Sequence, residues 1–119
     1  MTTSILKETR NLMTAKDLVL LTITIGDAQA GGSYVVLKFP DGHREKVSRN
    51  TQGQYPIPVR EGVVLNCVTT VQDINLSTNR TTVIHRFDHA EPAEHICQET
   101  VNNQNDKVIY DISYTFNQA

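Results

Sequence analysis

The sequence contains no tryptophan, three phenylalanines and two cysteines among its 119 residues. With so few aromatic side chains, a hydrophobic core has to be built mainly from valine, isoleucine and leucine. In a reducing compartment Cys67 and Cys97 would be free thiols. The disulfide and packed tryptophan that characterise true immunoglobulin domains are therefore not expected here.

Long hydrophobic runs and basic clusters are also missing. The longest purely apolar run is "LVLL" at residues 18–21, and residues 1–13 carry charges where a signal peptide needs an apolar segment. These absences predict a cytoplasmic protein without a membrane-inserted segment, with export by a signal-free route left open. The net charge of −2 disfavours phosphate binding, so no nucleic-acid partner is expected.

What the sequence does contain is apolar alternation with a period close to two, which is typical of β-strands that are buried on one face. The clearest case is "KVIYDISYTF", where residues 108, 110, 112, 114 and 116 are apolar or aromatic. The same pattern predicts seven strands in all, at residues 18–25, 33–39, 43–48, 63–73, 80–87, 95–101 and 107–116. Residues 33–48 and 63–87 are each expected to form a hairpin.

This pattern predicts an all-β fold, a single-domain antiparallel β-sandwich of about seven strands with an immunoglobulin-like or similar Greek-key arrangement. Residues 15–119 are expected to form the domain. Residues 1–14 are predicted to be a flexible tail or a short helix, because Ile5, Leu6, Leu12 and Met13 would share one helical face. No helix of crossover length separates the strands, which argues against a parallel α/β fold.

One stretch, "HRFDHAEPAEHIC" at residues 85–97, holds three of the four histidines and one of the two cysteines. His95 and Cys97 would point to the same face of a strand, about 6.5 Å apart at Cα, which suits two ligands of one zinc ion. His85 or His89 could add a third ligand if the loop between them folds back. His85 and His89 alone lie too far apart in an extended chain.

The same stretch also has an ordinary structural interpretation. His85 would be a half-buried strand residue, His89 would lie in a solvated acidic loop, and Cys97 would be a small core residue. No strong zinc spacing such as CxxC or HExxH occurs. Neighbouring carboxylates would raise the pKa of the Cys97 thiol, which disfavours a cysteine nucleophile.

Two functions are therefore predicted, in order of preference. The first is a non-catalytic binding or structural module that acts through protein–protein contacts, self-association included. The alternative is a small metal-binding protein or metal-dependent enzyme that holds zinc with His85, His89, His95 and Cys97. An enzyme without a metal has no catalytic constellation to support it, and no other cofactor is predicted.

Overall fold

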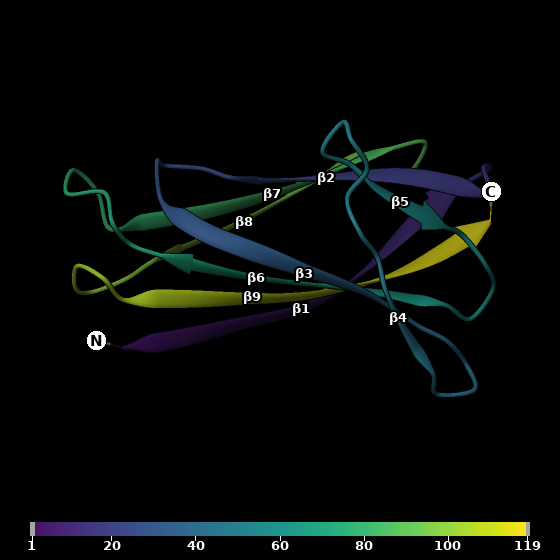
Figure 1. Ribbon diagram of the computed structural model, residues 1–119, viewed down its shortest axis with the longest axis horizontal. Coiled ribbons are helices and arrows are strands. Elements are labelled where there is room, and N and C mark those ends of the chain that lie inside the picture. Colours follow the sequence, from purple (N-terminus) through teal and green to yellow (C-terminus); the bar gives the residue numbers. More distant parts are fainter. Residues whose placement is uncertain (1, 119) are drawn as a thin grey trace.

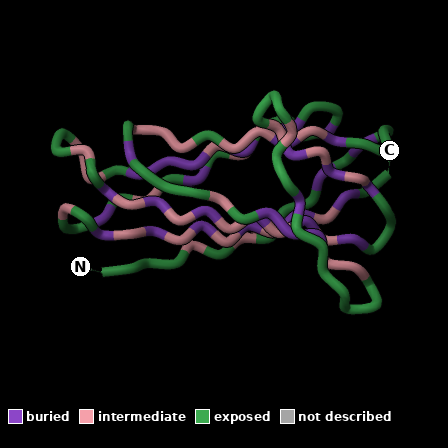
Figure 2. The backbone as a smooth tube through the Cα atoms, in the orientation of Figure 1, coloured by how far each residue is buried: buried purple, intermediate pink, exposed green. Residues whose placement is uncertain are grey.

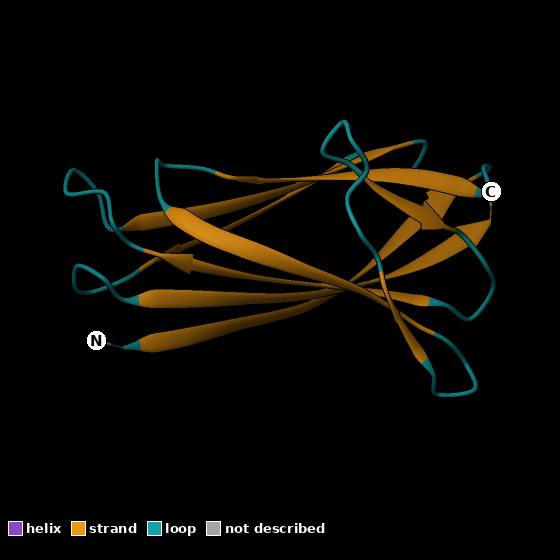
Figure 3. Ribbon diagram, viewed as in Figure 1, coloured by secondary structure: helices purple, strands orange, loops and turns teal. Residues whose placement is uncertain are grey.

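The computed structural model of the chain describes residues 2–118, and these residues form nine strands and no helix (Figures 1 and 3). The strands are β1 (Thr3–Thr14), β2 (Leu18–Ile25), β3 (Ala30–Lys38), β4 (Arg44–Lys46), β5 (Tyr55–Pro58), β6 (Val64–Gln72), β7 (Arg80–Asp88), β8 (Glu94–Thr100) and β9 (Lys107–Gln118).

The strands make two sheets that pack face to face as a sandwich (Figure 1). A five-stranded sheet has the order β1-β9-β6-β3-β4, and a four-stranded sheet has the order β5-β2-β7-β8. Two connections, β3 to β4 and β7 to β8, are hairpins within one sheet, and the other connections cross between the sheets. The predicted all-β sandwich is confirmed, while its immunoglobulin-like connectivity stays a prediction.

The core lies between the sheets and follows the alternation of the sequence. In β9 and β6 every second residue is buried and the residues between them are half-buried, as Figure 2 shows along the central strands. Tyr110, Ile112 and Tyr114 of β9 have no exposed surface. Tyr110, Tyr114 and Phe87 are the largest fully buried side chains, and the hydroxyl groups of the two tyrosines need hydrogen-bond partners inside the core.

The expectation of an N-terminal tail or short helix is wrong. Residues 3–14 form β1, which pairs parallel with β9 over its whole length, from Thr3 opposite Lys107 to Thr14 opposite Gln118. Leu6 and Leu12 turn toward the core, while Ile5 and Met13 turn outward. A dozen residues make a marginal helix in isolation, whereas the open side of β9 offers hydrogen-bond partners along the whole segment. This is the one parallel pair among the strands described.

The predicted hairpin at residues 63–87 is also wrong, because its two strands lie in different sheets. β6 pairs with β3 and β9, and β7 pairs with β2 and β8. The residues between them cross the end of the sandwich instead of making a hairpin turn. The predicted hairpin at residues 33–48 is confirmed by the pairing of β3 with β4.

Across residues 2–118 the structure has no helix long and apolar enough to cross a membrane.

Candidate functional site

The most notable cluster of chemically active side chains lies where the edge strands of the two sheets face each other. β1 ends the five-stranded sheet and β8 ends the four-stranded sheet. On β8, His95 is half-buried and Cys97 is buried, and both point toward β1 as alternation requires. On β1, Glu8 points inward and reaches the same place.

The three side chains meet closely. The Nε2 atom of His95 lies 3.3 Å from the Sγ atom of Cys97 and 3.0 Å from the Oε2 atom of Glu8. One potential ligand atom from each residue lies within 4.8 Å of the other two, and in residues 2–118 no second group of three such side chains is this close. Arg10 also binds Oε2 of Glu8, with its Nη2 atom at 2.7 Å.

The electrostatics favour a carboxylate and a neutral thiol at this cluster. Burial opposes ionisation of Glu8, but hydrogen bonds and charge from Arg10 and His95 outweigh it, so the carboxyl pKa lies below its usual value. Burial, reinforced by the Glu8 carboxylate, raises the pKa of the Cys97 thiol to about 11. Without a bound cation the thiol is therefore protonated at neutral pH.

The geometry is unlike that of a nucleophilic cysteine activated by histidine. In such a triad one ring nitrogen takes the thiol proton while the other is held by a carboxylate. Here the same nitrogen, Nε2 of His95, contacts both the sulfur and the carboxylate. A single imidazole nitrogen cannot serve both roles, and the raised thiol pKa points the same way.

His85 lies next to this cluster but is engaged elsewhere. It stands directly opposite His95 in the pairing of β7 with β8, and it is fully buried. Its Nδ1 atom lies 2.5 Å from the hydroxyl oxygen of Tyr114, and its Nε2 atom has no hydrogen-bond partner within the described chain. Burial, with a smaller contribution from His95, lowers the pKa of His85 to about 4, so the ring is neutral at pH 7.

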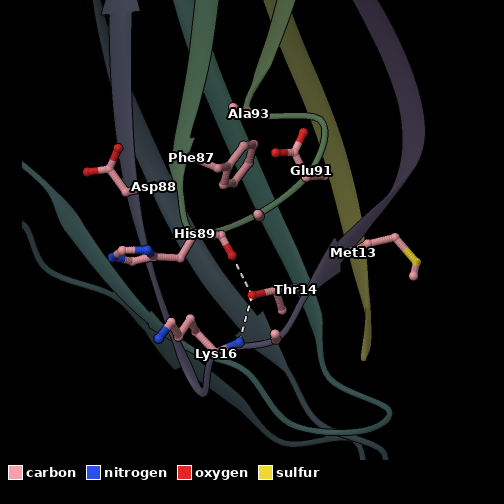
Figure 4. Close-up of a pocket in the computed structure, with 10 residues that line it drawn as sticks. Met13, Thr14, Lys16, Phe87, Asp88, His89, Glu91 and Ala93 are labelled. Atoms are coloured by element: carbon pink, nitrogen blue, oxygen red, sulfur yellow. Dashed lines mark hydrogen bonds between the residues drawn. The ribbon is translucent and has the colours of Figure 1, made fainter. Parts of the chain in front are cut away.

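His89 does not join the other predicted ligands. It lies in the turn between β7 and β8 with a positive φ of 76°, and its side chain is exposed. Figure 4 shows its imidazole pointing away from Met13 of β1, while its carbonyl accepts a hydrogen bond from the hydroxyl of Thr14. The surface cavity at this turn has a volume of about 600 Å³ and is lined on one side by Asp88, His89 and Glu91.

Of the four predicted ligands, the structure therefore brings His95 and Cys97 together and separates His89 from them. The residue that the sequence analysis missed is Glu8, which is 87 positions away from His95 in the chain. Its inward orientation follows from β1 being a strand, with Glu8 on the same face as Leu6 and Leu12. A tail or short helix at residues 1–14 has no such face, so the prediction for this segment gave no indication of Glu8.

No protein family, curated protein or solved structure matches this chain. Its function has to be inferred from the geometry of its own residues.

Proposed function

We propose that the chain is a non-catalytic β-sandwich module that self-associates by pairing the open edges of β1 from two copies. The observation that supports this most directly is the open edge itself. β1 is the outermost strand of its sheet and runs for twelve residues, most of them exposed. Such an edge presents main-chain donors and acceptors to another strand.

The hydrogen bonds fix which main-chain groups of β1 are available. The Lys107 N–H bonds to the Thr2 carbonyl, so the main-chain N–H and C=O groups of the even-numbered residues of β1 point toward β9. The main-chain groups of the odd-numbered residues point away from β9. Met13 is an example, because its N–H and C=O each bond to the main chain of Glu91 at 2.8 Å. Within the described chain that is the one isolated bridge at this edge. The edge is therefore open from Ile5 to Asn11.

The other three edge strands are poorer candidates for pairing. β4 has three residues and β8 has seven. β5 has four residues, of which Pro56 and Pro58 have no N–H to donate. β1 is the longest edge strand, and its residues from Ile5 to Asn11 all retain a main-chain N–H.

Charge selects one register for two antiparallel copies of β1. In a two-fold symmetric pair, centring the contact on Lys7, Glu8 or Arg10 would place that charge directly opposite its own copy, which is unfavourable. Centring it on Thr9 places Glu8 opposite Arg10 of the partner subunit, twice by symmetry. Charged edges commonly prevent indiscriminate pairing, and these charges disfavour the registers centred on residues 7, 8 and 10 while the register centred on residue 9 gains two opposite-charge pairs.

The test uses two single charge reversals, Glu8→Arg and Arg10→Glu, with sedimentation equilibrium over a wide concentration range. We expect wild type to form dimers. Each variant alone should dissociate, because residues 8 and 10 then carry the same charge and meet as like pairs across the two-fold axis. A wild-type chain that stays monomeric at its solubility limit would overturn the proposal.

An equimolar mixture of the two variants serves as the matched control for folding. One variant then carries glutamate at both positions 8 and 10, and the other carries arginine at both, so each glutamate faces an arginine. We expect a heterodimer in the mixture at concentrations where neither variant dimerises alone. If wild type dimerises but the mixture stays monomeric, the contact uses another surface and the β1 assignment is wrong.

A further inference from the structure

We infer that Glu8, His95 and Cys97 form a binding site for a tetrahedral transition-metal ion, with zinc as the best match. This inference does not depend on self-association. The site combines residues from the edge strands of both sheets, so a bound ion would join β1 to β8. One carboxylate, one imidazole and one thiolate are all established zinc ligands, whereas magnesium and calcium avoid sulfur.

The distances between the ligand atoms are close to those of a zinc shell. With Zn–N and Zn–O bonds of about 2.0 Å and a Zn–S bond of about 2.3 Å, tetrahedral geometry separates nitrogen from sulfur by about 3.5 Å and nitrogen from oxygen by about 3.3 Å. The observed separations from His95 Nε2 are 3.3 Å to Cys97 Sγ and 3.0 Å to Glu8 Oε2. Shifts of a few tenths of an ångström would bring these two separations to the tetrahedral values, and the third separation, between Cys97 and Glu8, lies within 4.8 Å.

The orientation of His95 supports the same conclusion. Its Nε2 atom points at both the sulfur and the carboxylate, which is the arrangement of a metal ligand whose lone pair is directed between its neighbours. Charge balance also fits, because a carboxylate and a thiolate together neutralise a divalent cation. Metal binding would deprotonate the Cys97 thiol despite its burial, since the cation reverses the local charge.

The cluster is partly exposed to solvent, so an ion can enter it and a water molecule can serve as the fourth ligand. The side chains of His95 and Glu8 are 17% and 24% exposed, so solvent reaches the cluster and water can complete the tetrahedron. Arg10 donates its Nε and Nη2 hydrogens to the same oxygen, Oε2 of Glu8, and an ionised carboxylate oxygen has two lone pairs, so one of them can be directed at the ion. His85, opposite His95 on β7, is committed to Tyr114 through Nδ1.

The test is an anaerobic titration of untagged, reduced protein with Co²⁺, followed by displacement with Zn²⁺. We expect one ion per chain, the visible bands of tetrahedral cobalt, and a thiolate-to-cobalt charge-transfer band that zinc removes. Cys97→Ser should abolish the charge-transfer band. His95→Asn should weaken binding by at least about 100-fold, because loss of even an outer-shell partner costs about 10–100-fold.

The matched control is His89→Asn, since His89 is exposed and lies outside the cluster, and asparagine tolerates its positive φ. It should bind cobalt like wild type. Thermal unfolding without metal checks that every variant folds, and zinc should raise the melting temperature of wild type and His89→Asn alone. Absence of the charge-transfer band in wild type, or full affinity retained by His95→Asn, would overturn the site.

Discussion

At the scale of single residues, His85 is the clearest source of pH-dependent stability. The ring is buried without a charged partner, and burial lowers its pKa to about 4. The unfolded chain, with an ordinary histidine pKa, binds a proton at higher pH than the folded chain does. His85 therefore does not lower the free energy of unfolding above about pH 6.5. Below that pH the free energy of unfolding decreases, and it continues to decrease as the pH falls toward 4.

We expect the wild-type free energy of unfolding to fall by about 2 kcal/mol between pH 7 and pH 5 from this residue alone. Urea unfolding at both pH values measures it. His85→Gln is the reference, because glutamine keeps a hydrogen-bonding group near Tyr114 and does not titrate. Equal losses in wild type and His85→Gln would show that His85 is protonated without penalty in the folded state.

At the scale of the strand, β1 is an integral part of the sandwich, and two of its residues test this directly. The Leu12 side chain is 1% exposed and the Ile5 side chain is 67% exposed. Leu12→Ala should destabilise the chain by about 2–5 kcal/mol because it leaves a cavity. Ile5→Ala should change stability by about 0.5 kcal/mol or less.

Denaturant unfolding of both variants, at one low protein concentration, checks the expectation for β1. The two substitutions are chemically similar and lie on opposite faces of one strand, so each controls for the other. Equal and small effects would mean that residues 3–14 do not pack in solution as β1 does in the structure.

The contrast between β9 and β1 shows what the sequence could and could not predict about the fold. In β9 the alternation extends over ten residues, which a helix cannot mimic, and the predicted strand is confirmed. In β1 the apolar residues 5, 6, 12 and 13 come in adjacent pairs. Adjacent pairs suit one helical face as well as two strand faces, so local periodicity cannot decide between them. Residues 3–14 form a strand because they pair with the open side of β9, which is distant in the sequence.

The candidate site also has one part that the sequence predicts and one part that it does not. His95 and Cys97 are two residues apart, and their shared face follows from the strand pattern alone. Glu8 could not be found because its contact with His95 depends on how the two sheets are stacked. The hairpin predicted for residues 63–87 failed for a related reason. Residues 73–79 do connect the two strands outside any sheet, but no local feature distinguishes a turn within one sheet from a crossing between sheets.

At the scale of the whole molecule, Glu8 takes part in both the proposed dimer contact and the proposed metal site. In the dimer its carboxylate faces Arg10 of the partner subunit, and in the metal site it neutralises part of the charge of the ion. Zinc bound to Glu8 weakens its attraction for arginine, so the two events oppose each other. Such coupling is reciprocal, because the dimer must then bind zinc more weakly by the same factor.

We therefore expect zinc to weaken dimerisation of wild type by about tenfold, a typical size for coupling between two binding events. Sedimentation equilibrium with and without zinc measures the shift. The control is Cys97→Ser, which removes one metal ligand from β8 and leaves β1 unchanged, so zinc should not alter its dimerisation. Tighter dimers with zinc would mean that the ion bridges two copies instead of two strands of one copy. An equal shift in Cys97→Ser would assign the effect to metal bound elsewhere on the surface.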